Sequence, residues 1–250
     1  MKPVKIPDMV VHQLEATILE GIFKPGDRLP PERELSERFH VSRPSLREAI
    51  KKLEARGLVQ TRRGGGTYVT RLLDTSFTQP LAELFQSHPE TLWDLLEMRQ
   101  ALEGVAAYYA ALRRTEADLE ILTRRFEAMN AVYAQKQGAL VESKVDAEFH
   151  LAIAEAAHNV VLLHIMRGLF DLLHSGIRTS LELMHTRIGA QDPIHDHHRG
   201  LLEAVRAGDA ERAREMAYAH ISYIRGTLED IEAEKRRCER SQRRLQGLGD

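Results

Sequence analysis

The spacing of apolar residues divides the chain into a mixed front part and an all-helical rear part. Between Pro31 and Gly57, apolar positions recur at intervals of three and four residues, which is the repeat of amphipathic helices. Two short strand-like runs follow at 58–61 and 67–70. From Thr91 onward only the helical repeat remains. The pattern predicts a mostly α fold, with a small winged region in front of an all-helical antiparallel bundle.

The front part has the element order of a helix-turn-helix. Residues 31–39 predict one short helix, because a proline and acidic residues stand in its first turn. Three residues separate it from a second helix, for which Ser42 is a good N-cap and Gly57 a good C-terminal stop. A tight turn of this length joins the two helices of the DNA-binding motif. A further helix, expected at 9–20 with Asp8 as its cap, precedes them.

The second of these helices separates its apolar residues from its basic ones. Its apolar residues share one face, and Arg43 and Arg47 point away from that face near the start of the helix. The hairpin tip that follows sets Arg63 beside Gly64, which suits a close approach to phosphate or to a narrow minor groove. We predict that the helix enters the major groove of DNA and that the hairpin is a wing. Taken alone, the helix could equally be an ordinary solvated surface helix.

Composition and charge narrow the class of protein. With 250 residues, 43% hydrophobic and 29% charged, the chain is long enough for two ordinary domains and has a soluble, globular composition. Its single cysteine, Cys238, excludes an internal disulfide framework and a cysteine-based zinc finger. No signal peptide and no apolar run of ~20 residues is found, so we expect a cytoplasmic protein without a membrane partner. Residues 1–70 hold 13 Lys and Arg against 9 Asp and Glu, whereas residues 71–250 hold 22 against 28. The basic excess therefore lies where DNA phosphates would bind.

Four regions are predicted. Residues 1–70 form a winged helix-turn-helix DNA-binding domain, and residues 71–90 form a linker whose apolar stretch, 77–85, is a short helix. Residues 91–236 form an all-helical domain, and residues 237–250 form a charged tail that frays. Six helices with short connections are expected in the all-helical domain, at 92–112, 115–133, 140–157, 160–183, 193–207 and 209–235.

Inside the helical region, one carboxylate and three imidazoles fall on apolar helix faces. Asp146 and His150 are four residues apart, so they share one face, and His198 and His220 each stand among apolar residues at helical spacing. Any one of these histidines is more often a core residue with an ordinary hydrogen bond. Burying all four groups together is costly unless a divalent metal binds their lone pairs.

Two members of this predicted site have alternatives that the sequence leaves open. His195 and His197 compete with His198 for one place, and we prefer His198 because its face is more apolar. Arg99 interrupts the apolar stripe of the first bundle helix, where a guanidinium needs an anionic partner. Glu103, one turn further on, is one candidate partner, and the carboxylate of a bound ligand is the other.

Three motifs of the front part resemble the N-terminal domain of the GntR family of bacterial transcription factors. They are GDRLPPEREL at 26–35, VSRPSLREA at 41–49 and GGGTYV at 64–69. The resemblance implies that Arg33, Arg43 and Arg47 touch the operator and that Gly64 sits at the minor groove. The predicted DNA contacts comprise Arg33, Ser42, Arg43, Ser45, Arg47, Arg63 and Gly64.

Four motifs of the rear part look like the effector-binding and dimerisation domain of the FadR subfamily, the FCD type. They are LLEMRQALE at 95–103, DAEFH at 146–150, HRGLLEA at 198–204 and GDAERA at 208–213. The resemblance implies that Asp146, His150, His198 and His220 hold a divalent ion and that Arg99 helps to bind an acid. It is greatest to the branch that responds to pyruvate, lactate or glycolate, and the presence of all four ligands favours a 2-hydroxy acid.

The two resemblances predict a homodimeric transcription regulator, not an enzyme. Its partners would be a pseudo-palindromic double-stranded DNA operator and a small carboxylic acid such as lactate, glycolate or pyruvate. Zinc is the expected ion, with nickel or manganese as alternatives. Two other interpretations remain: a purely structural metal with a different organic acid as effector, or a metal that activates water in an enzyme.

Overall fold

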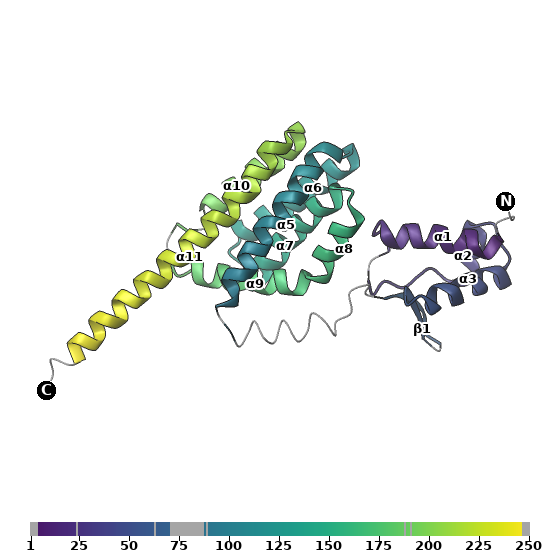
Figure 1. Cartoon of the computed structure of the whole chain (residues 1–250), viewed down its shortest axis with the longest axis horizontal. Helices are drawn as coiled ribbons and strands as arrows, with labels where there is room; N and C mark the ends of the chain where they lie inside the picture. Colours follow the sequence, from purple (N-terminus) through teal and green to yellow (C-terminus); the bar gives the residue numbers. More distant parts are fainter. Residues whose placement is uncertain are drawn as a thin grey trace. The chain divides into compact units, whose positions relative to one another are not determined.

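The computed structural model describes residues 5–23, 25–62, 64–70, 88, 90–187, 189–190 and 192–246. These residues form ten helices and one two-stranded sheet, which confirms the mostly α fold (Figure 1). The chain separates into two compact units, 1–77 and 78–250, and each is described by itself. The predicted linker helix at 77–85 and the wing residue Arg63 lie outside the described residues.

The described residues of the N-terminal unit form three helices and a hairpin. Helix α1 is Ile6–Leu19, α2 is Glu32–Arg38 and α3 is Arg43–Ala55, and strands β1, Val59–Arg62, and β2, Gly66–Val69, form the hairpin. Its core is made of apolar residues from all of these elements and from the loop before α2. They are Val10, Val11, Leu14, Ile18, Leu29, Leu35, Leu46, Ala49, Ile50, Leu53, Val59 and Val69.

Helix α1 begins earlier than the sequence predicted, and Asp8 is not its cap. The helix starts at Ile6 with Lys5 at the N-cap, and Pro7 stands in the first turn, where its fixed φ and missing N–H cost nothing. Asp8 instead lies inside the first turn, and its Oδ1 accepts a hydrogen bond from Lys52 Nζ of α3 at 2.8 Å. The aspartate therefore links two helices of this unit.

Both ends of α3 follow the local signals in the sequence. The Ser42 side chain accepts a hydrogen bond from the backbone N–H of Ser45 at 3.3 Å, as an N-cap does. At the other end, Gly57 adopts φ +71°, and the backbone N–H of Leu58 donates to the carbonyl of Leu53 at 3.0 Å. The hairpin pairs antiparallel, from Val59 opposite Val69 to Arg62 opposite Gly66.

The second unit is a bundle of helices. Its described residues form α5 Thr91–Arg113, α6 Glu116–Ala134, α7 Ala139–Ala156, α8 Val160–Gly168, α9 Phe170–Met184, α10 Asp192–Ala207 and α11 Ala210–Gln246. Helix α5 packs against α11 and α7, α7 also packs against α6 and α9, and α10 packs along α11 (Figure 1). Helix α5 thus lies between α7 and α11. Among the described residues, no helix is long and apolar enough to span a membrane.

Two helices of this unit differ from the sequence prediction. The single helix expected at 160–183 is divided into α8 and α9 around Leu169, next to Gly168, whose residue type is a poor helix former. The last helix continues to Gln246, whereas we expected it to end near Lys235 and the tail to fray. Ion pairs one turn apart, such as Arg236 with Glu232 at 3.1 Å, support its exposed end.

Candidate metal, effector and DNA sites

Helix α7 carries two polar residues into the centre of the bundle. Asp146 and His150 are one turn apart on the face that α5, α6 and α9 cover, and both side chains are buried. Apolar residues such as Phe149 and Ile153 lie around them on the buried side of the helix. The packing that buries this face therefore also buries a carboxylate and an imidazole.

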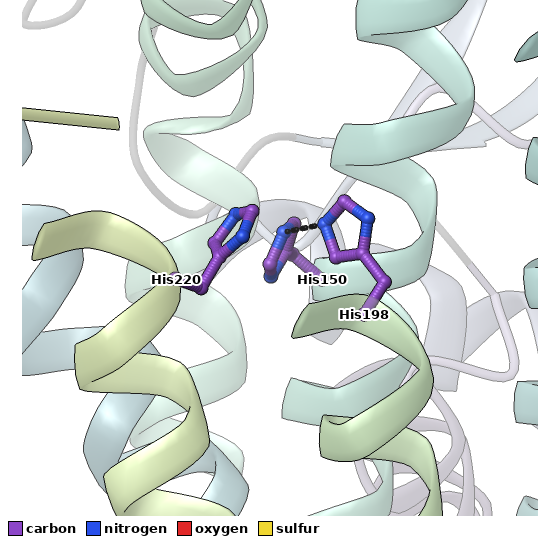
Figure 2. A group of neighbouring side chains, drawn as sticks. All are labelled: His150, His198 and His220. Atoms are coloured by element: carbon purple, nitrogen blue, oxygen red, sulfur yellow. Dashed lines mark hydrogen bonds between the residues drawn. The ribbon is translucent and has the colours of Figure 1, made fainter. Parts of the chain in front are cut away.

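Two further helices bring one imidazole each to the same place. His198 comes from α10 and His220 from α11, and both are fully buried with His150 (Figure 2). Ring nitrogens of the three residues lie within 4.8 Å of one another. His150 Nε2 and His198 Nε2 are 3.2 Å apart, and the ring centroids of His198 and His220 are 4.4 Å apart. Three separate helices thus direct imidazoles into one small space.

The Asp146 carboxylate completes this cluster. Its Oδ1 lies 3.5 Å from His150 Nε2, and its Oδ2 lies 3.5 Å from His198 Nε2. The Tyr133 hydroxyl of α6 donates a hydrogen bond to Oδ2 at 2.7 Å. The four residues that the sequence singled out as metal ligands are therefore neighbours in the structure, and Tyr133 fixes the carboxylate from outside.

Arg99 and Glu103, both on α5, extend the polar centre. Arg99 Nε donates to Glu103 Oε1 at 2.7 Å, and Glu103 Oε2 lies 3.0 Å from His150 Nδ1. Both side chains are almost fully buried, at 1% and 4% exposed. Glu103 is thus the partner of Arg99 that the sequence suggested, and it also contacts His150 Nδ1, which leaves Nε2 directed toward Asp146 and His198.

Burial and neighbouring charges set the protonation of these groups. Burial lowers the pKa of His198 and of His220 well below the ordinary histidine value, and the nearby His150 adds to the effect. Burial also tends to lower the pKa of His150, but the carboxylates of Glu103 and Asp146 together outweigh burial and the pKa is raised. For Glu103 itself, burial tends to raise the pKa, but the positive charge of Arg99 and the contact with His150 together outweigh burial and lower the pKa. His198 and His220 are therefore neutral imidazoles, the form that binds metals.

Several buried polar atoms of this centre have no hydrogen-bond partner within the described residues. They are Nδ1 of His198, both ring nitrogens of His220, Oδ1 of Asp146, and both terminal nitrogens of Arg99. Buried polar atoms without partners are costly and rare. Three imidazoles from three helices, together with a carboxylate on one of them, suit a divalent cation such as Zn²⁺, and the free guanidinium nitrogens suit a carboxylate.

The other two candidate histidines lie outside this cluster. His195 Nδ1 is 3.1 Å from Arg199, and its ring packs against Phe126 at a centroid distance of 5.7 Å. His197 is half-buried, with its ring against Tyr223 at 5.3 Å. The structure therefore places only His198, of the three in α10, beside His150.

The predicted DNA contacts on the helix-turn-helix are solvent-exposed or half-buried. Arg43 is the first residue of α3. Ser42 caps the helix in front of it, and the hydroxyl oxygens of Ser42 and Ser45 are 2.9 Å apart. Arg33 on α2 and Arg47 on α3 keep 73% and 64% of their side chains exposed. The basic side of α3 is thus open, as a major-groove reader needs.

Two glycines of the wing adopt backbone conformations with positive φ. Gly64 has φ +70° and Gly66 has φ +101°, conformations in which an L side chain is strained. A Cβ at Gly66 would lie 2.6 Å from Arg28 Nε, so the Arg28 side chain crosses the wing directly over this glycine. Arg62 stacks on the ring of Tyr68, with 4.6 Å between its guanidinium carbon and the ring centroid. The tip is therefore narrow and basic.

Comparison with protein families identifies both units. Residues 7–69 match the family described as bacterial regulatory proteins, gntR family, and residues 94–223 match the FCD domain. The chain belongs to the GntR family. The GntR helix-turn-helix implies DNA binding, and the FCD domain implies binding of a small-molecule effector. GntR proteins are transcription regulators rather than enzymes, which agrees with the prediction from the sequence.

Several relatives of this GntR protein have been named for the operons they regulate. The Escherichia coli (strain K12) protein provisionally named as the L-lactate dehydrogenase operon regulatory protein is 37% identical over 94% of this chain and 91% of its own length. The Glc operon transcriptional activator of the same strain is 36% identical over 92% and 91%. LutR of Bacillus subtilis (strain 168) is 35% identical over 84% and 95%. The structure of a Streptococcus agalactiae GntR protein superimposes with a TM-score of 0.55 at 25% identity, over 88% of this chain and 98% of that one.

Two contacts of the GntR protein's polar centre were not foreseen from its sequence. Tyr133 binds Asp146 across two helices, and Glu103 contacts His150 as well as Arg99. The ion pair between Arg99 and Glu103 was predictable from the sequence, because the two residues are one helical turn apart. The other two contacts could not be predicted from the spacing within one helix, since they depend on how α5, α6 and α7 pack.

Proposed function

We propose that this GntR protein is a transcription regulator whose operator binding is controlled by a small carboxylic acid bound beside a metal ion in the helical unit. The observation that carries the proposal is the convergence of three buried imidazoles and a carboxylate next to a guanidinium with two unpartnered nitrogens. The acid class is a 2-hydroxy or 2-oxo acid such as lactate, glycolate or pyruvate. The name of one relative, which refers to L-lactate dehydrogenase, supports that class.

Each residue has a distinct task in this proposal. Asp146, His150, His198 and His220 hold the ion, which would offer open coordination positions to the carboxylate and the 2-oxygen of the acid. Arg99 binds the acid's carboxylate through its two terminal nitrogens, while its Nε remains on Glu103. Zinc suits the imidazole-rich set best, and nickel or manganese are the alternatives.

The regulatory step follows from linkage. We propose a homodimer in the cytoplasm, because two recognition helices related by a two-fold axis read a pseudo-palindromic operator. An acid that binds one arrangement of the dimer better than the other shifts the population toward it, with a coupling of roughly 1–3 kcal/mol. Operator affinity then changes by the same factor as acid affinity.

The ligand set is tested by metal analysis of matched histidine variants. His198→Ala should lower the amount of metal bound per chain. The matched variant His197→Ala changes the half-buried histidine next to it in sequence and should leave the metal content unchanged. Elemental analysis after dialysis gives the metal content. Equal metal content in the two variants would remove His198 from the ligand set.

The acid site is tested by calorimetric titration of L-lactate, glycolate and pyruvate into zinc-loaded protein. We expect saturable binding of at least one acid, abolished by chelation and weakened at least tenfold in Arg99→Lys, which keeps the charge but loses the planar fork. Arg113→Lys, an exposed change on the same helix, is the control. Binding that is indifferent to chelation would leave the ion a structural role, and binding of none of the acids would reject the effector class.

A further inference from the structure

The exposed end of α11 has a feature that neither the metal centre nor the helix-turn-helix explains. Beyond Leu228, the last fully buried residue of this helix, α11 continues to Gln246 and extends past the other helices of its unit (Figure 1). Every described residue from 234 to 246 is exposed. This segment therefore contributes nothing to the apolar core of the bundle.

Five arginines occupy one side of this segment. At 100° per residue, Arg236, Arg237, Arg240, Arg243 and Arg244 fall within an arc of about 120°, and we call them the arginine stripe. The residues of α11 that pack on the bundle fall on the opposite side of the helix. The stripe therefore faces away from the surface that α11 buries, and it is open along its whole length.

The charge of the stripe is poorly compensated. Residues 235–246 contain six lysines and arginines and a single acid, Glu239. Arg236 pairs with Glu232 at 3.1 Å, and Arg240 donates to the carbonyl of Arg236. Within the described residues, Arg237, Arg243 and Arg244 have no ion pair or hydrogen bond. A concentrated, unpaired positive charge of this kind attracts a polyanion.

We propose that the arginine stripe binds the phosphate backbone of duplex DNA without regard to sequence. The stripe is about 12 Å long, the rise of eight helical residues, and DNA carries about seven charges over such a length. Guanidinium groups match phosphate geometry, and the unit at the other end of the chain already binds DNA. This contact adds sequence-independent affinity to the reading of bases by α3.

An anionic membrane surface is the competing partner for a basic helix. A helix that lies on a membrane needs a broad apolar face opposite its basic face. Opposite the stripe stand Cys238, Gln242 and Leu245, and Leu245 is the only large apolar residue among 232–246. The segment lacks the apolar face, so its chemistry favours DNA.

The test compares salt dependence of DNA binding between charge-matched variants of the full chain. The stripe variant is Arg237→Gln, Arg243→Gln and Arg244→Gln, and the control replaces Arg124, Arg212 and Arg225, exposed arginines that pair with neighbouring acids. The probe is a 30-base-pair duplex of mixed sequence, followed by fluorescence anisotropy from about 50 to 200 mM salt. Glutamine keeps helix propensity close to that of arginine, and circular dichroism checks that α11 remains folded.

The expected outcomes are specific. The slope of log K against log salt should fall by about 2.7 for three lost phosphate contacts in the stripe variant, and remain unchanged in the control. Replacement of the same three residues by lysine should keep the slope. An unchanged slope in the stripe variant, or an equal loss in the control, would overturn the proposal. So would a stripe variant that instead loses binding to phosphatidylserine vesicles or changes its oligomeric mass in light scattering while its DNA slope is constant.

Discussion

Two arginine–glutamate pairs of nearly equal length lie in contrasting parts of the molecule. On the helix-turn-helix, Arg47 Nε is 2.8 Å from Glu32, and the side chains are 64% and 40% exposed. In the helical unit, Arg99 Nε is 2.7 Å from Glu103, and the side chains are 1% and 4% exposed. Distance alone does not distinguish the two pairs, but their surroundings do.

The difference teaches what each region can do with its charges. The exposed pair contributes about 0.2–1 kcal/mol at most, because water screens it, so Arg47 can leave its glutamate at little cost, as the predicted contact with DNA would require. The buried pair cannot be separated without leaving an isolated charge in the bundle, which costs several kcal/mol. The fold therefore does not depend on the exposed pair of the helix-turn-helix, whereas it does depend on the buried pair of the helical unit.

The largest expected effect comes from breaking the buried pair. Glu103→Leu should lower the free energy of unfolding of the metal-free protein by about 3–5 kcal/mol, because the Arg99 guanidinium is left buried without an anion. Urea denaturation in the presence of a chelator measures this change and excludes loss of metal as its cause.

The double variant Arg99→Met with Glu103→Leu is the matched control for that experiment. Removing both charges should restore most of the lost stability, since no uncompensated ion remains. The explanation is wrong if the single variant is as stable as the parent protein, or if the double variant is no more stable than the single one. The stability of this centre would then not depend on the pairing of Arg99 with Glu103.

The exposed pair should give the opposite result. Arg47→Ala should weaken binding to an operator selected from random duplexes by about 1–3 kcal/mol, the range for a base contact, while the free energy of unfolding changes by less than about 0.5 kcal/mol. Arg38→Ala, at the exposed end of α2, is the control and should keep operator affinity. If Arg47→Ala lowered the free energy of unfolding but kept operator affinity, Arg47 would serve the fold rather than DNA binding, and the contrast drawn between the two regions would be wrong.

The same contrast explains what the sequence could predict of the fold. The helix-turn-helix was predictable because its signals are local: Ser42 caps α3, Gly57 ends it, and glycines shape the wing. The start of α1 was wrong because Asp8 was taken as a cap, although Pro7 marks the first turn. The division between α8 and α9 was missed because the apolar repeat continues across Leu169.

The buried polar centre of the helical unit was predictable only in part, for a physical reason. Asp146 and His150 share a helix face by their spacing, and the apolar neighbours of His198 and His220 indicated burial. The contacts that orient these side chains depend on interhelical packing, which the apolar pattern of a single helix does not contain. The hydrogen bond from Tyr133 to Asp146 is such a contact. The two residues are thirteen positions apart and lie on different helices, so no helical spacing relates them.

A third acidic group has an exposure between those of Glu32 and Glu103, and we expect its substitution to have a smaller effect on stability than breaking the buried pair. Asp118, with 15% of its side chain exposed, accepts hydrogen bonds from the backbone N–H and the hydroxyl of Thr115 at 2.8 and 2.7 Å, and lies 2.8 Å from His158 Nε2. Burial tends to raise its pKa, but these partners outweigh burial and lower the pKa below 3.8. Because the unfolded chain then binds the proton more readily, the stabilisation by the Asp118 carboxylate is complete above pH 3.8 and is lost as pH falls through the pKa of the folded protein.

Asp118→Asn should lower the free energy of unfolding at pH 7 by about 1 kcal/mol, the usual value of a cap, and the difference from the parent protein should disappear in acid. Urea titrations across this pH range measure it, with Glu116→Gln in the same helical turn as the control. A gap that stays constant with pH would mean that the charge of Asp118 contributes nothing beyond its hydrogen bonds.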